Sequence, residues 1–288
     1  MTELATVHQW PTLEHPVLVV AMEGWIDAGL AASTATATLL GAMPNELLAT
    51  FDPDELIDYR ARRPTLQIVN GVDTELRWPE IRLMSATNRT GRSVLILSGP
   101  EPDMRWHQFV TEVVQLASRL EVEQVVGLGA FPAPVPHTRP VRLVGTSTES
   151  ELAARVGFLP ASIEVPSGVQ GALEVAFGEA SRPAVGLWAR VPHYASAMPY
   201  PAAAAALLDG LARMAELELD TTALHAAASA THQQIEQLIA GSDEHAALVQ
   251  QLETQQDREE GLAATGFGDL PSGDELAAEL ERFLRGQG

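Results

Sequence analysis

The chain has 288 residues, 46% of them hydrophobic, and a formal net charge of −20 at pH 7. This charge argues against nucleic acid or an anionic membrane as a partner, because both need a positively charged surface, and no apolar run approaches the ~20 residues of a membrane span. Cysteine and lysine are both absent, which excludes disulfides, thiolate chemistry and lysine Schiff bases and makes the cytoplasm the default compartment.

Strand-like and helix-like segments alternate along the first two thirds of the chain. Such alternation is typical of α/β proteins, so we predict a mostly parallel twisted sheet flanked by helices. The expected strands are 17–22, 46–51, 81–84, 93–97, 125–129, 142–144 and 184–189, and the expected helices among them are 30–40, 106–120, 149–155 and 169–177.

The chain changes character after residue 201, where the sequence predicts three helices in succession. Residues 216–288 hold 15 acidic residues against three arginines. We therefore predict an α/β core domain at 1–215 and an acidic helical extension at 216–288. The glycine-rich stretch near 258–273 indicates a linker, and a last helix beyond it has one apolar face that must dock on something. The three expected helices are 201–218, 221–240 and 242–257.

The turn after the first buried strand is the first candidate site. Glu23, Trp25 and Asp27 lie between or beside the glycines of this turn. In an open α/β sheet, ligands bind outside the carboxyl ends of the strands. Simpler interpretations stay open, because Asp27 suits the N-cap of the following helix and Trp25 suits a cover over the core.

Four further polar loops follow strand-like runs or adjoin helices, and several of them would lie at the same edge of the sheet. Arginine with histidine suits a small anionic ligand such as phosphate, and a carboxylate beside His137 suits acid–base chemistry. The same side chains equally suit solvated turns, buried hydrogen-bonded groups or a subunit contact. The ligand or interface candidates are Glu23, Trp25, Asp27, Arg60, Arg62, Arg63, Glu101, His137, Arg139, Arg190, His193 and Tyr194.

Familiar catalytic motifs are missing from the chain. It has no glycine-rich dinucleotide fingerprint, no nucleophile elbow and no EF-hand loop. His225, His232 and His245 lack His-x-x-x-His spacing and a clustered acid, so we expect no metal site. We expect no cofactor either, assign no catalytic residue and favour a protein that is not an enzyme.

Five segments together resemble the actinobacterial branch of the proteasome assembly chaperone family. The likeness covers roughly residues 8–215, with the segments in the expected order. The resemblance implies a fold like that of purine nucleoside phosphorylases, a homo-oligomer such as a trimer, and protein clients such as proteasome subunits. The five segments are Gly24–Gly29, Asp58–Pro64, Gly99–Asp103, Pro136–Pro140 and Ala189–Tyr194.

Three interpretations of function follow. The favoured one is a non-enzymatic assembly chaperone or interaction protein, consistent with the resemblance and the missing catalytic motifs. The alternative is an enzyme or binding protein with a small anionic, phosphate- or nucleoside-like ligand at the carboxyl ends of the strands; because fold alone does not fix function, that alternative rests on analogy. In a third interpretation the polar loops form only the oligomer interface.

Overall fold

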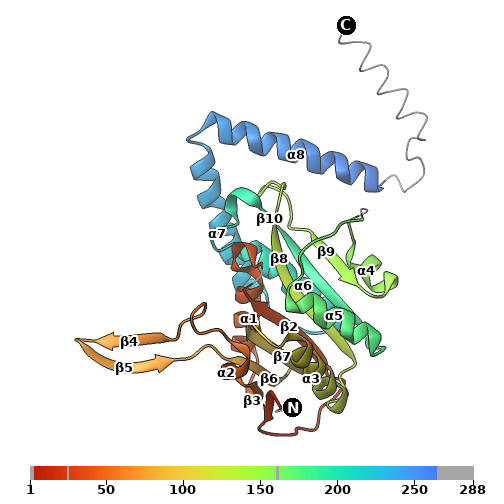
Figure 1. The fold of residues 1–288 in the computed structure, drawn as a ribbon. Coiled ribbons are helices and arrows are strands. Elements are labelled where there is room, and N and C mark those ends of the chain that lie inside the picture. Colours follow the sequence, from red (N-terminus) through yellow and green to blue (C-terminus); the bar gives the residue numbers. More distant parts are fainter. Residues whose placement is uncertain (1–2, 25, 160–161, 265–288) are drawn as a thin grey trace. The chain divides into compact units, whose positions relative to one another are not determined.

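The computed structural model describes residues 3–24, 26–159 and 162–264. The chain divides into two compact units, Met1–Gln237 and Leu238–Gly288. Figure 1 shows the elements of both. Among the described residues, no helix combines the length and the apolar character that crossing a bilayer requires.

An eight-stranded sheet forms the centre of the described part of the first unit (Figure 1). The neighbours β7–β2, β2–β8 and β8–β10 pair in parallel, and the outer strands on both sides pair antiparallel. The expected parallel arrangement therefore holds at the centre, and the sheet as a whole is mixed. Across the sheet the strands are β1 (Ala5–Val7), β3 (Asn45–Phe51), β6 (Ile81–Thr87), β7 (Ser93–Pro100), β2 (Val17–Glu23), β8 (Gln124–Ala133), β10 (Ala184–Pro192) and β9 (Leu143–Ser147).

Helices cover both faces of this sheet. Successive residues of a strand point to opposite faces. Leu18 and Val20 of β2 belong to a core cluster with Phe109 and Phe177 from the helices α3 and α5. The other face meets α1 and α6, which pack against each other. The four main helices are α1 (Ala31–Ala42), α3 (Trp106–Arg119), α5 (Val169–Glu179) and α6 (Pro201–Ala215), and the short helices are η1 (Ala28–Leu30), α2 (Pro53–Leu56), α4 (Ser150–Val156) and η2 (His193–Ala195).

The run Val17–Ala21 explains why β2 lies at the centre of the sheet. All five of its residues are buried. A strand covered by helices on both faces needs apolar side chains at every position instead of an alternating pattern. This buried run places the turn that follows β2 at the carboxyl edge of the parallel strands.

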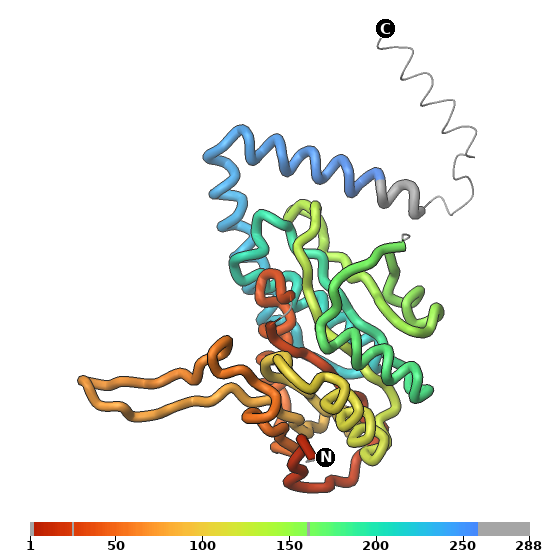
Figure 2. The backbone as a smooth tube through the Cα atoms, in the orientation of Figure 1, coloured from red at the N-terminus to blue at the C-terminus, as the bar shows by residue number. Residues whose placement is uncertain are grey.

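A β-hairpin that was not predicted from the sequence extends from the first unit. Its strands β4 (Thr65–Val69) and β5 (Val72–Arg77) form a separate two-stranded sheet, and the tube in Figure 2 shows it projecting as an arm. Asn70 and Gly71 connect the strands with φ of 52° and 81°. Two positive φ values in a two-residue loop are typical of a type I′ turn, and Asn-Gly is its strongest sequence signal.

The chain continues into two long helices, α7 (Thr222–Ile239) and α8 (Asp243–Ala264). The division between the two compact units falls at Gln237, within α7. Residues 258–264 were expected to begin a linker and are instead the end of α8. The rest of that expected linker and the final amphipathic helix lie outside the described residues.

Candidate functional site

The loops that follow the parallel strands carry most of the candidate residues. β7, β2, β8 and β10 run in the same direction and end at one edge of the sheet. Glu23 ends β2, Glu101 follows β7 directly, and His137 and Tyr194 lie just beyond β8 and β10. Their contacts form two clusters, one on the β2–β7 side and one on the β8–β10 side.

Arg62 is the centre of the first cluster. Its Nη1 donates to the backbone carbonyl of Glu101 and lies 3.1 Å from Oδ1 of Asp103. The turn after β2 approaches the same guanidinium, since a Cβ built on Gly24 would lie 2.5 Å from Nη2 of Arg62. Arg62 therefore ties the loop before the arm to the ends of two strands, and Asp103 already balances its charge.

Glu101 connects this cluster to helix α5. Its backbone N–H donates to the Glu23 carbonyl at 2.6 Å, and its Oε2 accepts from the N–H of Val169 at 3.3 Å. Burial raises the pKa of Glu101 above its ordinary value, although the Val169 hydrogen bond and the Arg62 charge act in the opposite direction. The carboxylate thus satisfies a backbone donor at the amino end of a helix, where a negative charge is favoured.

A cavity of about 470 Å³ opens beside the first cluster, between β2, β6, β7 and α1. Its charged lining residues are Glu23, Arg62, Glu80 and Arg82, and Arg82 Nε lies 3.9 Å from the Glu80 carboxylate. Two carboxylates and two guanidinium groups leave the cavity without a strong preference for an anion. The other two arginines of the loop, Arg60 and Arg63, are exposed and do not line it.

His137 is the centre of the second cluster. Its side chain is 1% exposed, its backbone N–H donates to the Tyr194 hydroxyl at 2.8 Å, and its Nδ1 lies 2.8 Å from the same oxygen. Its Nε2 lies 3.0 Å from Oε1 of Glu236 on α7. His232, one turn earlier on α7, has its Nε2 3.8 Å from that carboxylate oxygen.

Asp27 organises the start of α1. Its two carboxylate oxygens accept from the backbone N–H groups of Ala32 and Ser33 at 2.7 and 3.0 Å, and from the Ser33 hydroxyl at 2.6 Å. This is a capping role, which satisfies donors that the first turn of a helix leaves unpaired. Trp25, the other candidate of this turn, lies outside the described residues.

The remaining candidates, Arg139, Arg190 and His193, lie close in sequence to His137 or to Tyr194. Arg139 and Arg190 are half-buried, and Arg190 donates its backbone N–H to the Arg142 carbonyl at 3.1 Å. His193 is exposed, and its ring centroid lies 5.4 Å from that of Tyr194.

The part that α7 plays in this cluster was not predicted from the sequence. The expectation that His232 has no acid clustered near it is wrong, because Glu236 lies on the same face of the helix. The four-residue spacing of His232 and Glu236 was the available signal, since residues i and i+4 are neighbours on a helix surface. Their contact with His137, almost a hundred residues earlier in the chain, could not be predicted from local sequence.

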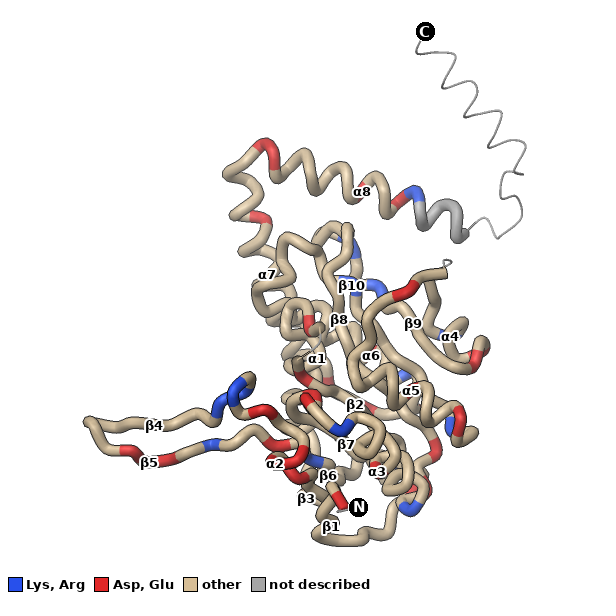
Figure 3. The backbone as a smooth tube through the Cα atoms, viewed as in Figure 1, with Lys and Arg blue, Asp and Glu red and all other residues tan. Residues whose placement is uncertain are grey.

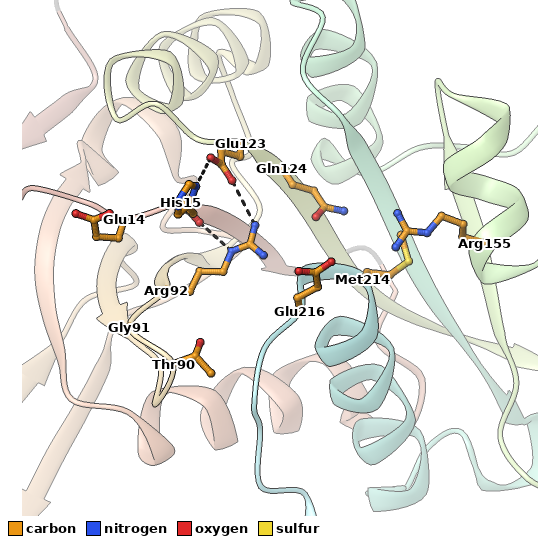
Figure 4. Close-up of a pocket in the computed structure, with 10 residues that line it drawn as sticks. All are labelled: Glu14, His15, Thr90, Gly91, Arg92, Glu123, Gln124, Arg155, Met214 and Glu216. Atoms are coloured by element: carbon orange, nitrogen blue, oxygen red, sulfur yellow. Dashed lines mark hydrogen bonds and ion pairs between the residues drawn. The ribbon is translucent and has the colours of Figure 1, made fainter.

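A second, larger pocket of about 740 Å³ lies at the opposite, amino edge of the strands (Figure 4). Arg92 crosses it and donates to the carbonyls of His15 and Ala215 at 2.9 and 2.5 Å. Glu123 lies 2.7 Å from His15 Nδ1 and 3.5 Å from Arg92 Nη2. These charged groups pair with one another and hold the start of β2 to the end of α6, which is a structural role.

Together, the mixed sheet covered by helices, the polar carboxyl edge and the protruding arm define an α/β protein. Residues 21–239 match the PAC2 family. Because that match covers most of the chain, the protein belongs to the PAC2 family. None of the curated proteins compared with the chain matches it.

Solved structures similar to this chain come from actinobacteria and archaea. A Mycobacterium tuberculosis protein of unknown function is 37% identical, with a TM-score of 0.85 over 92% of each chain. A proteasome-assembly chaperone homologue from the same organism is also 37% identical, with a TM-score of 0.76 over 81% of this chain and 99% of its own. An archaeal proteasome activator from Pyrococcus furiosus shares the fold, with a TM-score of 0.63 at 15% identity over 82% of this chain and 99% of its own.

Proposed function

We propose that the protein is a homo-oligomeric, non-enzymatic assembly chaperone or interaction protein, and that the β4–β5 arm joins its subunits. The observation that carries this proposal is the exposed apolar arm. The family and the relative named as a proteasome-assembly chaperone homologue support the chaperone role and suggest proteasome subunits as clients.

The arm is an element that needs a partner. Every residue of β4 and β5 is exposed, and a single two-stranded hairpin is only marginally stable in water. Its base is fixed by the rings of Tyr59 and Trp78, whose centroids lie 4.8 Å apart. The arginine-containing loop before β4, blue at the base of the arm in Figure 3, leads into it.

One face of the arm carries three apolar side chains, together with Asp73 as the cross-strand partner of Ile68. Leu66 and Ile68 are two residues apart on β4 and point to the same side, and Leu76 is the cross-strand partner of Leu66. These three side chains are 45%, 60% and 47% exposed. Since an element of this kind requires permanent cover and permanent interfaces are the more apolar class, we assign the arm to a second copy of the chain instead of a transient client.

Aspartate at the apolar face should dissociate the subunits. The double variant Leu66→Asp, Ile68→Asp buries two unpaired charges in the proposed interface, which costs several kcal/mol of association energy, on the order of a thousandfold in the dissociation constant. Size-exclusion chromatography with light scattering measures the molar mass. We expect an oligomer for the wild type and a monomer for the double variant.

Val175→Asp is the matched control, because Val175 is 53% exposed on α5 and lies outside the arm. It should keep the oligomer. A monomeric wild type, or a double variant with unchanged molar mass, would reject the role of the arm in assembly.

The client is tested by affinity purification of the full chain from its native host, followed by a high-salt wash and mass spectrometry. Recovery of proteasome α or β subunits is the result we expect. Recovery of the homo-oligomer alone would reject the chaperone role. The small-ligand alternative would then be the one to pursue, although Arg62, its most central arginine, already pairs with Asp103.

A further inference from the structure

The second cluster brings together three groups that bind metal ions. His137 comes from the loop after β8, and His232 and Glu236 come from one face of α7. One ligand atom from each of the three lies within 4.8 Å of the others. We propose that His137, His232 and Glu236 form a binding site for a divalent transition-metal ion of the Zn²⁺ class.

The distances suit such an ion. Zn²⁺ binds imidazole nitrogen and carboxylate oxygen at about 2.0–2.2 Å in tetrahedral geometry, which sets neighbouring ligand atoms about 3.4 Å apart. Two of the three edges lie on either side of this value, at 3.0 Å from His137 Nε2 to Glu236 Oε1 and 3.8 Å from His232 Nε2 to the same oxygen. The third edge, between the two imidazole nitrogens, is at most 4.8 Å, so the half-exposed side chains on α7 would have to rotate to bring it to the same value on binding.

Tyr194 holds His137 in the orientation that a metal ligand needs. Metal-binding histidines hydrogen-bond through their second ring nitrogen, which fixes both the ring and its tautomer. Here Nδ1 lies 2.8 Å from the Tyr194 hydroxyl, which also accepts the backbone N–H of His137. When Nδ1 carries the proton, Nε2 presents its lone pair toward Glu236 and His232. Without an ion, the other tautomer places a proton on Nε2, where it donates to Glu236.

The ligand types select the class of metal. Imidazole favours zinc, cobalt, nickel and copper, whereas magnesium and calcium prefer oxygen ligands throughout. Three protein ligands leave one tetrahedral position for water. The side chains of His232 and Glu236 are 45% and 51% exposed, so water has access to the site.

A bound ion would also fasten α7 to the loops after β8 and β10. Two of its ligands lie on α7, and the third is buried in the loop after β8 beside Tyr194; all three belong to the first unit. Binding to the folded chain alone stabilises it by mass action, so the midpoint of thermal unfolding should rise with metal concentration. We therefore expect the ion to raise the stability of the folded chain as well as to bind it.

The test uses the full chain without a histidine tag, treated with EDTA and dialysed. Titration with ZnCl₂ by calorimetry should show one ion per chain, and scanning fluorimetry should show a higher unfolding midpoint. Cobalt bound to the wild type should give the visible absorption of a tetrahedral nitrogen–oxygen site, and Zn²⁺ should displace it. The cobalt measurement depends on no substitution.

Two variants locate the site. His232→Ala and Glu236→Gln each remove a ligand and should weaken Zn²⁺ binding by at least about tenfold, with an unchanged far-ultraviolet circular dichroism spectrum because both side chains are half-exposed. His225→Ala is the matched control, since His225 lies on the same helix and pairs with Asp209 at 3.2 Å. Failure of the wild type to bind one ion, or equal affinity in the control and in both ligand variants, would overturn the proposal.

Discussion

Replacing Gly99 with alanine is expected to lower the free energy of unfolding by about 3–5 kcal/mol, which corresponds to a fall of about 10 °C in the unfolding midpoint. Gly99 has a φ of +127° near the end of β7, in a region that side chains rarely adopt. A Cβ there would also overlap the backbone carbonyl of Glu80 and lie 2.9 Å from the Cα of Ile81. Because both neighbours are backbone atoms, the clash cannot be relieved by a rotamer change. Thermal and urea unfolding of the purified variant measure the effect.

Gly91→Ala separates the two causes of this loss. Gly91 has a φ of +86°, yet no heavy atom lies within 4 Å of a Cβ built on it. It should lose only about 1 kcal/mol from backbone strain. Equal losses in the two variants would show that the close approach of β6 to the end of β7 adds nothing to the loss of stability in Gly99→Ala. The carboxyl edge would then not depend on that close approach.

Much of the core could be predicted because its signals are local. A fully apolar run such as Val17–Ala21 specifies a strand that is buried on both faces, and the apolar positions of α3 recur at helical spacing. The direction of the outer strands could not be predicted in this way. An apolar run shows burial but does not show whether the neighbouring strand runs parallel or antiparallel.

The arm was missed for a different physical reason. No face of β4 or β5 is buried within the chain, so the burial pattern that marks other strands is absent. The local signals were Asn70-Gly71, a turn sequence flanked by β-branched residues, and the short alternation of Leu66 and Ile68 with polar residues in β4.

For the candidate site too, some features could be predicted from local sequence and others depend on contacts between distant parts of the chain. The sequence placed Glu101, His137 and Tyr194 at one edge of the sheet, and the structure brings His137 to Tyr194. It also shows that Arg62 and Asp27 serve strand and helix ends. The contact of His137 with α7 depends on the path of the chain after α6, which no spacing rule describes.

Glu174 is expected to make the protein less stable as the pH rises from about 4.5 to about 7. It lies on α5, where its Oε2 accepts from the Thr146 hydroxyl at 3.0 Å, and Thr146 in turn accepts from the Trp188 indole at 3.0 Å. The three side chains converge over Gly186, whose missing Cβ would lie 2.7 Å from the carboxylate. Burial raises the pKa of Glu174 from 4.5 to about 7 despite the hydrogen bonds from Thr146 and Gly186.

The direction in which stability changes with pH follows from proton binding. Between the two pKa values the folded state holds a proton that the unfolded state has released, so the free energy of unfolding falls as the pH rises. The favourable contribution is complete below pH 4.5 and is lost above pH 7. After allowance for the partial exposure of the side chain, its size is about 1–3 kcal/mol.

Glu174→Gln keeps the shape of the protonated side chain and removes its titration. Urea unfolding from pH 4.5 to pH 8 should therefore show a variant close to the wild type at pH 4.5 and about 1–3 kcal/mol more stable at pH 8. Glu179→Gln is the matched control, because Glu179 is exposed on the same helix and its substitution should shift the curve little at any pH. If the difference between Glu174→Gln and the wild type does not grow with pH, the carboxyl is ionised in the folded protein at neutral pH. The cluster over Gly186 would then have to stabilise a buried negative charge through Thr146 and the backbone alone.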